Sequence, residues 1–206
     1  SLSDLELVHE DRDDTLSTIR YPLADGDGHI AIATVRPATI PADVAVAVHP
    51  DDARYSHLAG REVIVPWAER RVPVIADERV EREFGTGALK VTPGHDPLDF
   101  EIGRDHGLPE PMAVGWDGRM SEMAGDLAGL TQEEAGARVV AWAEERGLLE
   151  KKEPYRHSVG TCERCHSGAD ALCRSYRILG ENTQGGYGRH LVVPDANLSP
   201  LPERLM

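Results

Sequence analysis

The stretch Phe84-Gly-Thr-Gly-Ala-Leu-Lys-Val-Thr-Pro-Gly-His-Asp-Pro-Leu-Asp99 decides how this chain folds around its candidate site. Its first two glycines permit the positive φ of a tight turn. Side chains alternate between the two faces of a strand, so Lys90 and Thr92 are expected on one face. Asp96 has the position of a helix N-cap, with proline at N1 and Asp99 at N3. We therefore expect a turn, a short strand and a capped helix that form a polar pocket for an ammonium group and a hydroxyl.

A purely structural interpretation of the same stretch has to be considered. Asp96 and Asp99 would cap and complement a helix N-terminus in any protein, and the cap alone contributes about 0.5–2 kcal/mol. Lys90 by itself is typical of a solvated strand residue. The four polar residues lie within ten positions of one another and accompany an upstream segment of similar character, and this favours a site.

The upstream segment is Thr34-Val-Arg-Pro-Ala-Thr-Ile-Pro-Ala-Asp43. Its first three residues are the end of the alternating run 29–36, whose β-branched residues and period of two predict a strand. Thr34 and Arg36 are expected on the same face of that strand, which the following proline ends. Thr39 is then expected in a turn or a single helical turn before a second strand.

Together these two segments resemble the editing domain of class I aminoacyl-tRNA synthetases for branched aliphatic amino acids. Residues 34–39 are similar to the T-x-R-P-E-T motif of that family, and residues 84–100 resemble its G-T-G…H-D-x-x-D-F motif. Within the family, Lys90-Val-Thr92 and His95-Asp-Pro-Leu-Asp-Phe100 have the form of the valyl enzymes. The similarity runs from about residue 2 to residue 168.

The chain departs from the family pattern at three places. Ala38 replaces the glutamate of T-x-R-P-E-T, and Pro41-Ala42 replaces the usual Leu-Gly before Asp43. Residues 169–206 match no part of the family and read as a polar tail punctuated by glycine and proline, with disorder expected from Glu181 onward.

The resemblance implies hydrolysis of the ester bond of mischarged threonyl-tRNA(Val) by water. Threonine and valine are nearly isosteric, so a hydrophobic synthetic site discriminates poorly between them and a second pocket must recognise the hydroxyl. Asp99 would bind the substrate's ammonium, ionised by its place at a helix N-terminus. His95 is expected to be a structural hydrogen-bonding residue rather than a general base. The implied catalytic residues are Lys90, Thr92, Asp96 and Asp99, and the implied substrate-binding residues are Thr34, Arg36, Thr39, Phe84 and Asp99.

Several signatures of other activities are missing from the sequence. The chain has no H-I-G-H-type or K-M-S-K-S-type motif, so we expect no ATP-dependent aminoacylation from it, and ATP would serve only the full-length synthetase. It has no G-x-x-x-x-G-K-[ST] loop and no G-x-S-x-G elbow. The implied editing reaction needs no cofactor.

The 206 residues suffice for one domain with a real core, and 40% hydrophobic with 28% charged residues is typical of a soluble globular protein. No apolar run approaches the ~20 residues that span a bilayer. With no secretory signal visible, we expect a cytoplasmic monomer without membrane association.

The net charge of −14 argues against general nucleic-acid binding. The expected partners are the 3′ end of tRNA(Val) with its attached amino acid and the remaining synthetase domains.

The three cysteines are Cys162, Cys165 and Cys173. Cys162-Glu-Arg-Cys165 has the C-x-x-C spacing that places two thiolates on one zinc ion. His166 and Cys173 could complete a local site. The resemblance instead implies half of a zinc knuckle, whose other ligands lie outside this chain, upstream of Ser1. Reduced free thiols are a third interpretation, whereas a disulfide scaffold is not expected.

Many short strands followed by helices predict an α+β fold: a β-barrel-like editing domain of mainly antiparallel strands with peripheral helices. We expect the strands to close as a barrel. An acidic loop is expected to separate the first two strands. A capping box at Thr131 and Glu134 predicts a helix that ends at Gly147. The expected strands are 5–8, 16–21, 30–36, 44–48, 62–66, 71–75, 86–91 and 112–114, and the other helix is 97–106. The expected organisation is an editing domain at 1–158, a half zinc knuckle at 159–168 and the unmatched tail at 169–206.

Two other functions remain open from the sequence. The changes at Ala38, Pro41 and Ala42 are compatible with a non-catalytic synthetase fragment that acts only as a tRNA-binding or zinc-knuckle module. A free-standing deacylase that acts in trans is the third hypothesis, ranked last because the negative charge opposes independent capture of tRNA.

Overall fold

The structure is a computed structural model, and it describes residues 8–115 and 117–161. Cys162, Cys165 and the predicted tail lie outside the described residues, so the zinc and tail predictions remain predictions. The elements follow in the order β1 (Val8–Pro22), β2 (His29–Thr34), η2 (Pro37–Ala42), β3 (Ala45–Val48), η3 (Ser56–Leu58), β4 (Glu62–Ile64), β5 (Arg71–Ala76), β6 (Ala88–Val91), α1 (Pro97–Asp105), η4 (Glu122–Leu127), α2 (Gln132–Glu145) and β7 (Leu149–Thr161).

The strands form two sheets, one of three strands in the order β2-β1-β7 and one of four in the order β4-β5-β3-β6. All neighbours pair antiparallel except β3 and β5. The α+β class with mainly antiparallel strands is therefore confirmed. The expected closure into a barrel is wrong for the part of the chain that the structure describes. There the two sheets share an isolated antiparallel bridge between Leu23 and Val63 rather than a continuous ladder.

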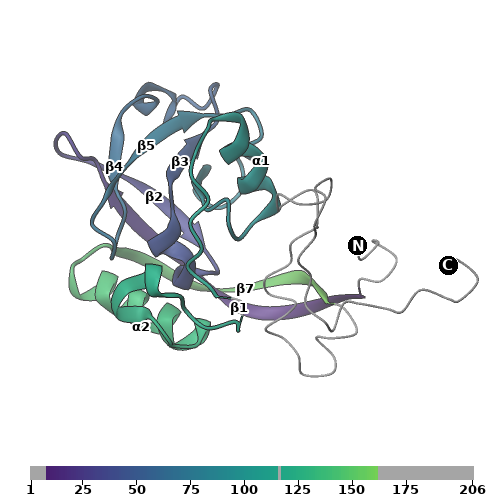
Figure 1. The fold of residues 1–206 in the computed structure, drawn as a ribbon. Coiled ribbons are helices and arrows are strands. Elements are labelled where there is room, and N and C mark those ends of the chain that lie inside the picture. The colour runs from purple at the N-terminus through teal and green to yellow at the C-terminus, as the bar shows by residue number, and fades with distance from the viewer. Residues whose placement is uncertain (1–7, 116, 162–206) are drawn as a thin grey trace, which may run out of the picture.

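Strand β3 lies between β5 and β6 in the four-stranded sheet and is buried on both faces. Val46 and Val48 belong to the larger hydrophobic core, which also receives α2. Ala45 and Ala47 point the other way into a smaller core, where Ile102 of α1 packs. Figure 1 shows α1 beside the four-stranded sheet and α2 next to β7 at the other end of the molecule. This placement leaves the C-terminal end of β6 facing the start of α1.

The long antiparallel ribbon of β1 and β7 differs most from expectation. The predicted acidic loop is part of β1, and β7 was not predicted at all. Asp11 lies 3.0 Å from Arg156, and Asp14 lies 2.7 Å from His157 on the opposite strand. Carboxylates are unfavourable in an isolated strand, but cross-strand hydrogen-bonded pairs such as that of Asp11 with Arg156 offset that preference.

Both helices begin as predicted. The Asp96 side chain accepts hydrogen bonds from the N–H groups of Leu98 and Asp99 at the start of α1. The capping box of Thr131 and Glu134 is present at the start of α2. The strand expected at 112–114 is reduced to a bridge between Val114 and Met120. None of the helices in the described ranges is both long enough and apolar enough to span a bilayer.

Candidate functional site

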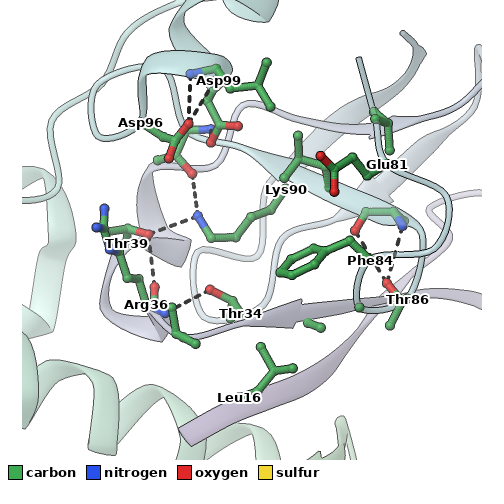
Figure 2. A pocket seen from close by; sticks show the side chains of 18 of the residues that line it. Leu16, Thr34, Arg36, Thr39, Glu81, Phe84, Thr86, Lys90, Asp96 and Asp99 are labelled. Atoms are coloured by element: carbon green, nitrogen blue, oxygen red, sulfur yellow. Dashed lines mark hydrogen bonds between the residues drawn. The ribbon is translucent and has the colours of Figure 1, made fainter. Parts of the chain in front are cut away.

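One pocket of about 440 Å³ gathers the predicted pocket residues of both motif segments. Its walls come from the end of β2, from η2, from the loop after β5, from β6 and from the start of α1. Figure 2 shows Thr39 and Lys90 close to Asp96 and Asp99, with Phe84 across the cavity. The predicted residues that line it are Thr34, Arg36, Thr39, Phe84, Lys90, Thr92, Asp96 and Asp99.

The pocket rests on a buried carboxylate that the sequence interpretation missed. Asp43 is fully buried at the C-cap of η2. One of its oxygens accepts hydrogen bonds from Lys90 Nζ at 3.1 Å and from Thr92 Oγ1 at 2.7 Å. The other accepts from the Tyr21 hydroxyl at 2.6 Å. Burial, and secondarily Asp43, raises the pKa of Tyr21 well above its usual value, so Tyr21 stays a neutral donor. The signal in the sequence was an aspartate between apolar residues, which is buried only when it is paired.

Lys90 holds the two threonines of the pocket in place. Its ammonium donates to Thr39 Oγ1 at 3.0 Å, to Thr92 Oγ1 at 2.5 Å and to Asp43. An ammonium has three protons, so these contacts use all of them. The Thr39 hydroxyl donates to the Arg36 carbonyl and the Thr92 hydroxyl to Asp43, which leaves each threonine oxygen one acceptor lone pair. The floor of the pocket therefore accepts hydrogen bonds and suits a ligand that donates them.

Asp99 is buried at the first turn of α1, with 4% of its surface exposed. One of its oxygens accepts a hydrogen bond from the Thr92 N–H at 2.8 Å. Burial raises the pKa of Asp99 to about 7, although the Lys90 charge opposes this change. Asp99 is therefore only partly ionised at neutral pH, whereas its place at a helix N-terminus had led us to expect the ionised form, because burial disfavours the charged carboxylate. A cation placed beside Asp99 would restore its charge.

The other predicted residues have more structural partners than expected. One Asp96 oxygen caps α1, which leaves the second oxygen for the pocket. Arg36 is exposed and donates to the His95 carbonyl at 3.4 Å. His95 Nε2 accepts from the Ala113 N–H at 2.9 Å, which agrees with the structural role expected for it. Thr34 Oγ1 accepts from the Arg36 N–H at 3.0 Å.

An aromatic wall on one side of the pocket includes residues that sequence reasoning missed. Phe84 is 52% exposed, and its ring lies edge-on to Tyr155 with a centroid distance of 6.2 Å. Tyr155 in turn lies 5.6 Å from the ring of His157. Tyr155 and His157 line the same pocket from β7. No local pattern pointed to them, since β7 is mostly exposed and polar.

The fold has a solved counterpart among synthetases of class I. The chain is similar to the leucyl-tRNA synthetase of Agrobacterium radiobacter K84, whose crystal structure is a ternary complex with tRNA and LeuAMS. The TM-score is 0.55 at 19% identity, and the match covers 77% of this chain and 22% of that chain. At this identity the likeness establishes the fold, which is that of a segment of a class I aminoacyl-tRNA synthetase.

Sequence comparison identifies the relatives of this chain more narrowly. The chain is 52% identical over 172 residues to the valine–tRNA ligase of Symbiobacterium thermophilum, which covers 84% of this chain. It is 48% identical over 164 residues, or 80% of its length, to the valine–tRNA ligase of Listeria monocytogenes. Each match spans 19% of the relative, so the chain corresponds to about one fifth of those enzymes. No family model matches the chain. The resemblance to the valyl branch is therefore confirmed.

Proposed function

We propose that this chain is an editing domain that hydrolyses the ester bond of threonyl-tRNA(Val). The observation that carries the proposal is the convergence of both motif segments on one pocket, with an acceptor floor and a buried carboxylate beside it. The matched valine–tRNA ligases, of which this chain spans about one fifth of the length, support the choice of substrate.

The acceptor floor supplies a reason to prefer threonine over valine. The free lone pairs of Thr39 and Thr92 can accept a hydrogen bond from the threonine side-chain hydroxyl. Valine would leave these buried oxygens without that partner, which costs about 1–3 kcal/mol per unpaired polar group. The pocket therefore selects for the hydroxyl and not for size.

Asp99 anchors the α-ammonium group in this proposal. Its ionised form pairs with the ammonium, which places the ester near Lys90, Thr92 and the free oxygen of Asp96. Phe84 and Arg36 at the rim contact the terminal adenosine of the tRNA. The attacking group is a water molecule held by these residues and by the ribose hydroxyl, and the proposal assigns no side chain as its general base.

A deacylation assay tests the proposal directly. Purified protein should release threonine from Thr-tRNA(Val) about 10- to 100-fold faster than valine from Val-tRNA(Val), following the cost of one or two unpaired acceptors. Asp99→Ala should lose at least about 100-fold in activity, because it removes a charge-assisted contact. Circular dichroism should show that the variant keeps its fold.

The assay also separates the alternatives. Equal rates on the two aminoacyl-tRNAs would overturn the threonine assignment. Absence of hydrolysis at high protein concentration, with retained tRNA binding, would support the non-catalytic module instead. Full activity in Asp99→Ala would show that the ammonium is anchored elsewhere.

A further inference from the structure

The loop that carries Phe84 is held at its base by a residue outside the pocket. Arg54 follows the turn after β3, and its Nη2 donates a hydrogen bond to the carbonyl oxygen of Arg82 at 2.7 Å. Arg82 lies two residues before Phe84. The contact therefore joins two loops that are 28 positions apart in the sequence.

Asp52 fixes the orientation of the Arg54 guanidinium. Its two oxygens accept hydrogen bonds from Arg54 Nε at 2.9 and 3.1 Å and from Nη2 at 2.6 Å. The Asp52 side chain is only 5% exposed, whereas that of Arg54 is 54% exposed. These hydrogen bonds lower the pKa of Asp52 to about 2, so the pair stays charged at neutral pH. A half-exposed arginine is thereby held in a single geometry.

The loop itself leaves room for this contact at Gly87. A Cβ atom there would lie closer than 3.0 Å to both the Arg54 guanidinium and the Arg82 carbonyl, and the φ of Gly87 is +81°. The Gly87 N–H donates to the Phe84 carbonyl at 2.9 Å, and the Phe84 N–H donates to the Glu81 carbonyl at 3.2 Å. Two successive turns therefore present Phe84 at the pocket, and Arg54 anchors the first of them.

We infer that Arg54 is a positioning residue that holds Phe84 where it contacts the terminal nucleoside of the bound aminoacyl-tRNA. The inference rests on the proposed function, since it assigns Arg54 a role in substrate binding through Phe84. Arg54 does not line the pocket, so its effect on activity passes through the loop.

A double-mutant cycle tests this coupling. Arg54→Ala should raise KM for Thr-tRNA(Val) about 10-fold with little change in kcat, since base–aromatic contacts contribute roughly 5- to 150-fold to binding. The double variant Arg54→Ala, Phe84→Ala should be no worse than Phe84→Ala alone. Arg61→Ala is the matched control, because Arg61 makes a similar bidentate pair with Asp25 away from the pocket and should leave KM unchanged.

Amide hydrogen exchange supplies a readout that does not depend on activity. In Arg54→Ala the amides of Phe84 and Gly87 should exchange at least about 5-fold faster than in the parent chain, because the anchor of their turns is lost. Unchanged exchange, or additive losses in the double variant, would overturn the role of Arg54. An inactive parent chain with faster exchange in the variant would instead overturn the proposed function and leave the anchoring role standing.

Discussion

The floor of the pocket and the ribbon of β1 and β7 use the same kind of interaction in opposite surroundings. In the pocket, the fully buried Asp43 pairs with Lys90, whose side chain is 11% exposed. In the ribbon, Asp11 pairs with Arg156 at nearly the same distance, with side chains 59% and 69% exposed. Water screens the ribbon pair but not the buried pair, so geometry alone does not indicate how much each pair stabilises the protein.

The largest expected effect comes from breaking the buried pair. Asp43→Ala removes the acceptor of three donors, from Tyr21, Lys90 and Thr92, and leaves an ammonium without its counter-ion. We expect the free energy of unfolding to fall by about 3–5 kcal/mol, as measured by urea denaturation.

Adding Lys90→Met to Asp43→Ala sharpens this comparison. The double variant should be less destabilised than the sum of the two single variants, because it removes the uncompensated charge. A loss below about 1 kcal/mol in Asp43→Ala would show that water reaches the pocket floor.

The next effect concerns Asp99, a buried carboxyl with an unusual titration. The pKa of Asp99 is raised from 3.8 to about 7 in the folded protein. At pH values between these two, the folded protein keeps a proton that the unfolded chain has released. The stabilising contribution of the protonated form is complete below pH 4 and is lost as pH rises through 7. This change amounts to at most about 4 kcal/mol.

Urea denaturation at a series of pH values checks this prediction. Asp99→Asn should remove the contribution of Asp99 to the pH dependence and should be more stable than the parent chain above pH 7. If the free energy of unfolding depends on pH in the same way in parent and variant, the dependence comes from groups other than Asp99.

The smallest effect is expected in the ribbon. Arg156→Ala should change the free energy of unfolding by less than about 0.5 kcal/mol, and the difference should shrink further in 1 M salt, where the Debye length is about 3 Å. Asp11→Ala should behave in the same way. A loss above about 2 kcal/mol that persists in 1 M salt would contradict the contrast with the pocket floor.

Local chemistry accounts for the parts of the fold that the sequence predicted well. The N-cap of α1 at Asp96 and the capping box of α2 at Thr131 depend on residues within four positions of each other. The turn before β6 has positive φ at Gly85 and Gly87, as the glycines indicated. Interactions of this range can be recognised in a single stretch of sequence.

Long-range pairing accounts for what the sequence interpretation missed. The acidic residues of β1 read as a loop because their partners on β7 lie more than 140 positions away. Asp43 drew no attention because Tyr21 and Lys90 reach it from separate strands. Whether the described strands close into a barrel depends on which strand edges meet, and a list of strands does not contain that information.

The sequence by itself determined the α+β class, the two helix starts, the motif segments and the resemblance to valyl synthetases. Only the tertiary structure placed Asp43 beneath Lys90 and brought Tyr155 opposite Phe84. It also buried Asp99 deeply enough to raise its pKa. The physical reason is that capping and strand alternation act between neighbours in the chain, whereas desolvation and buried ion pairs depend on every element packed around a group.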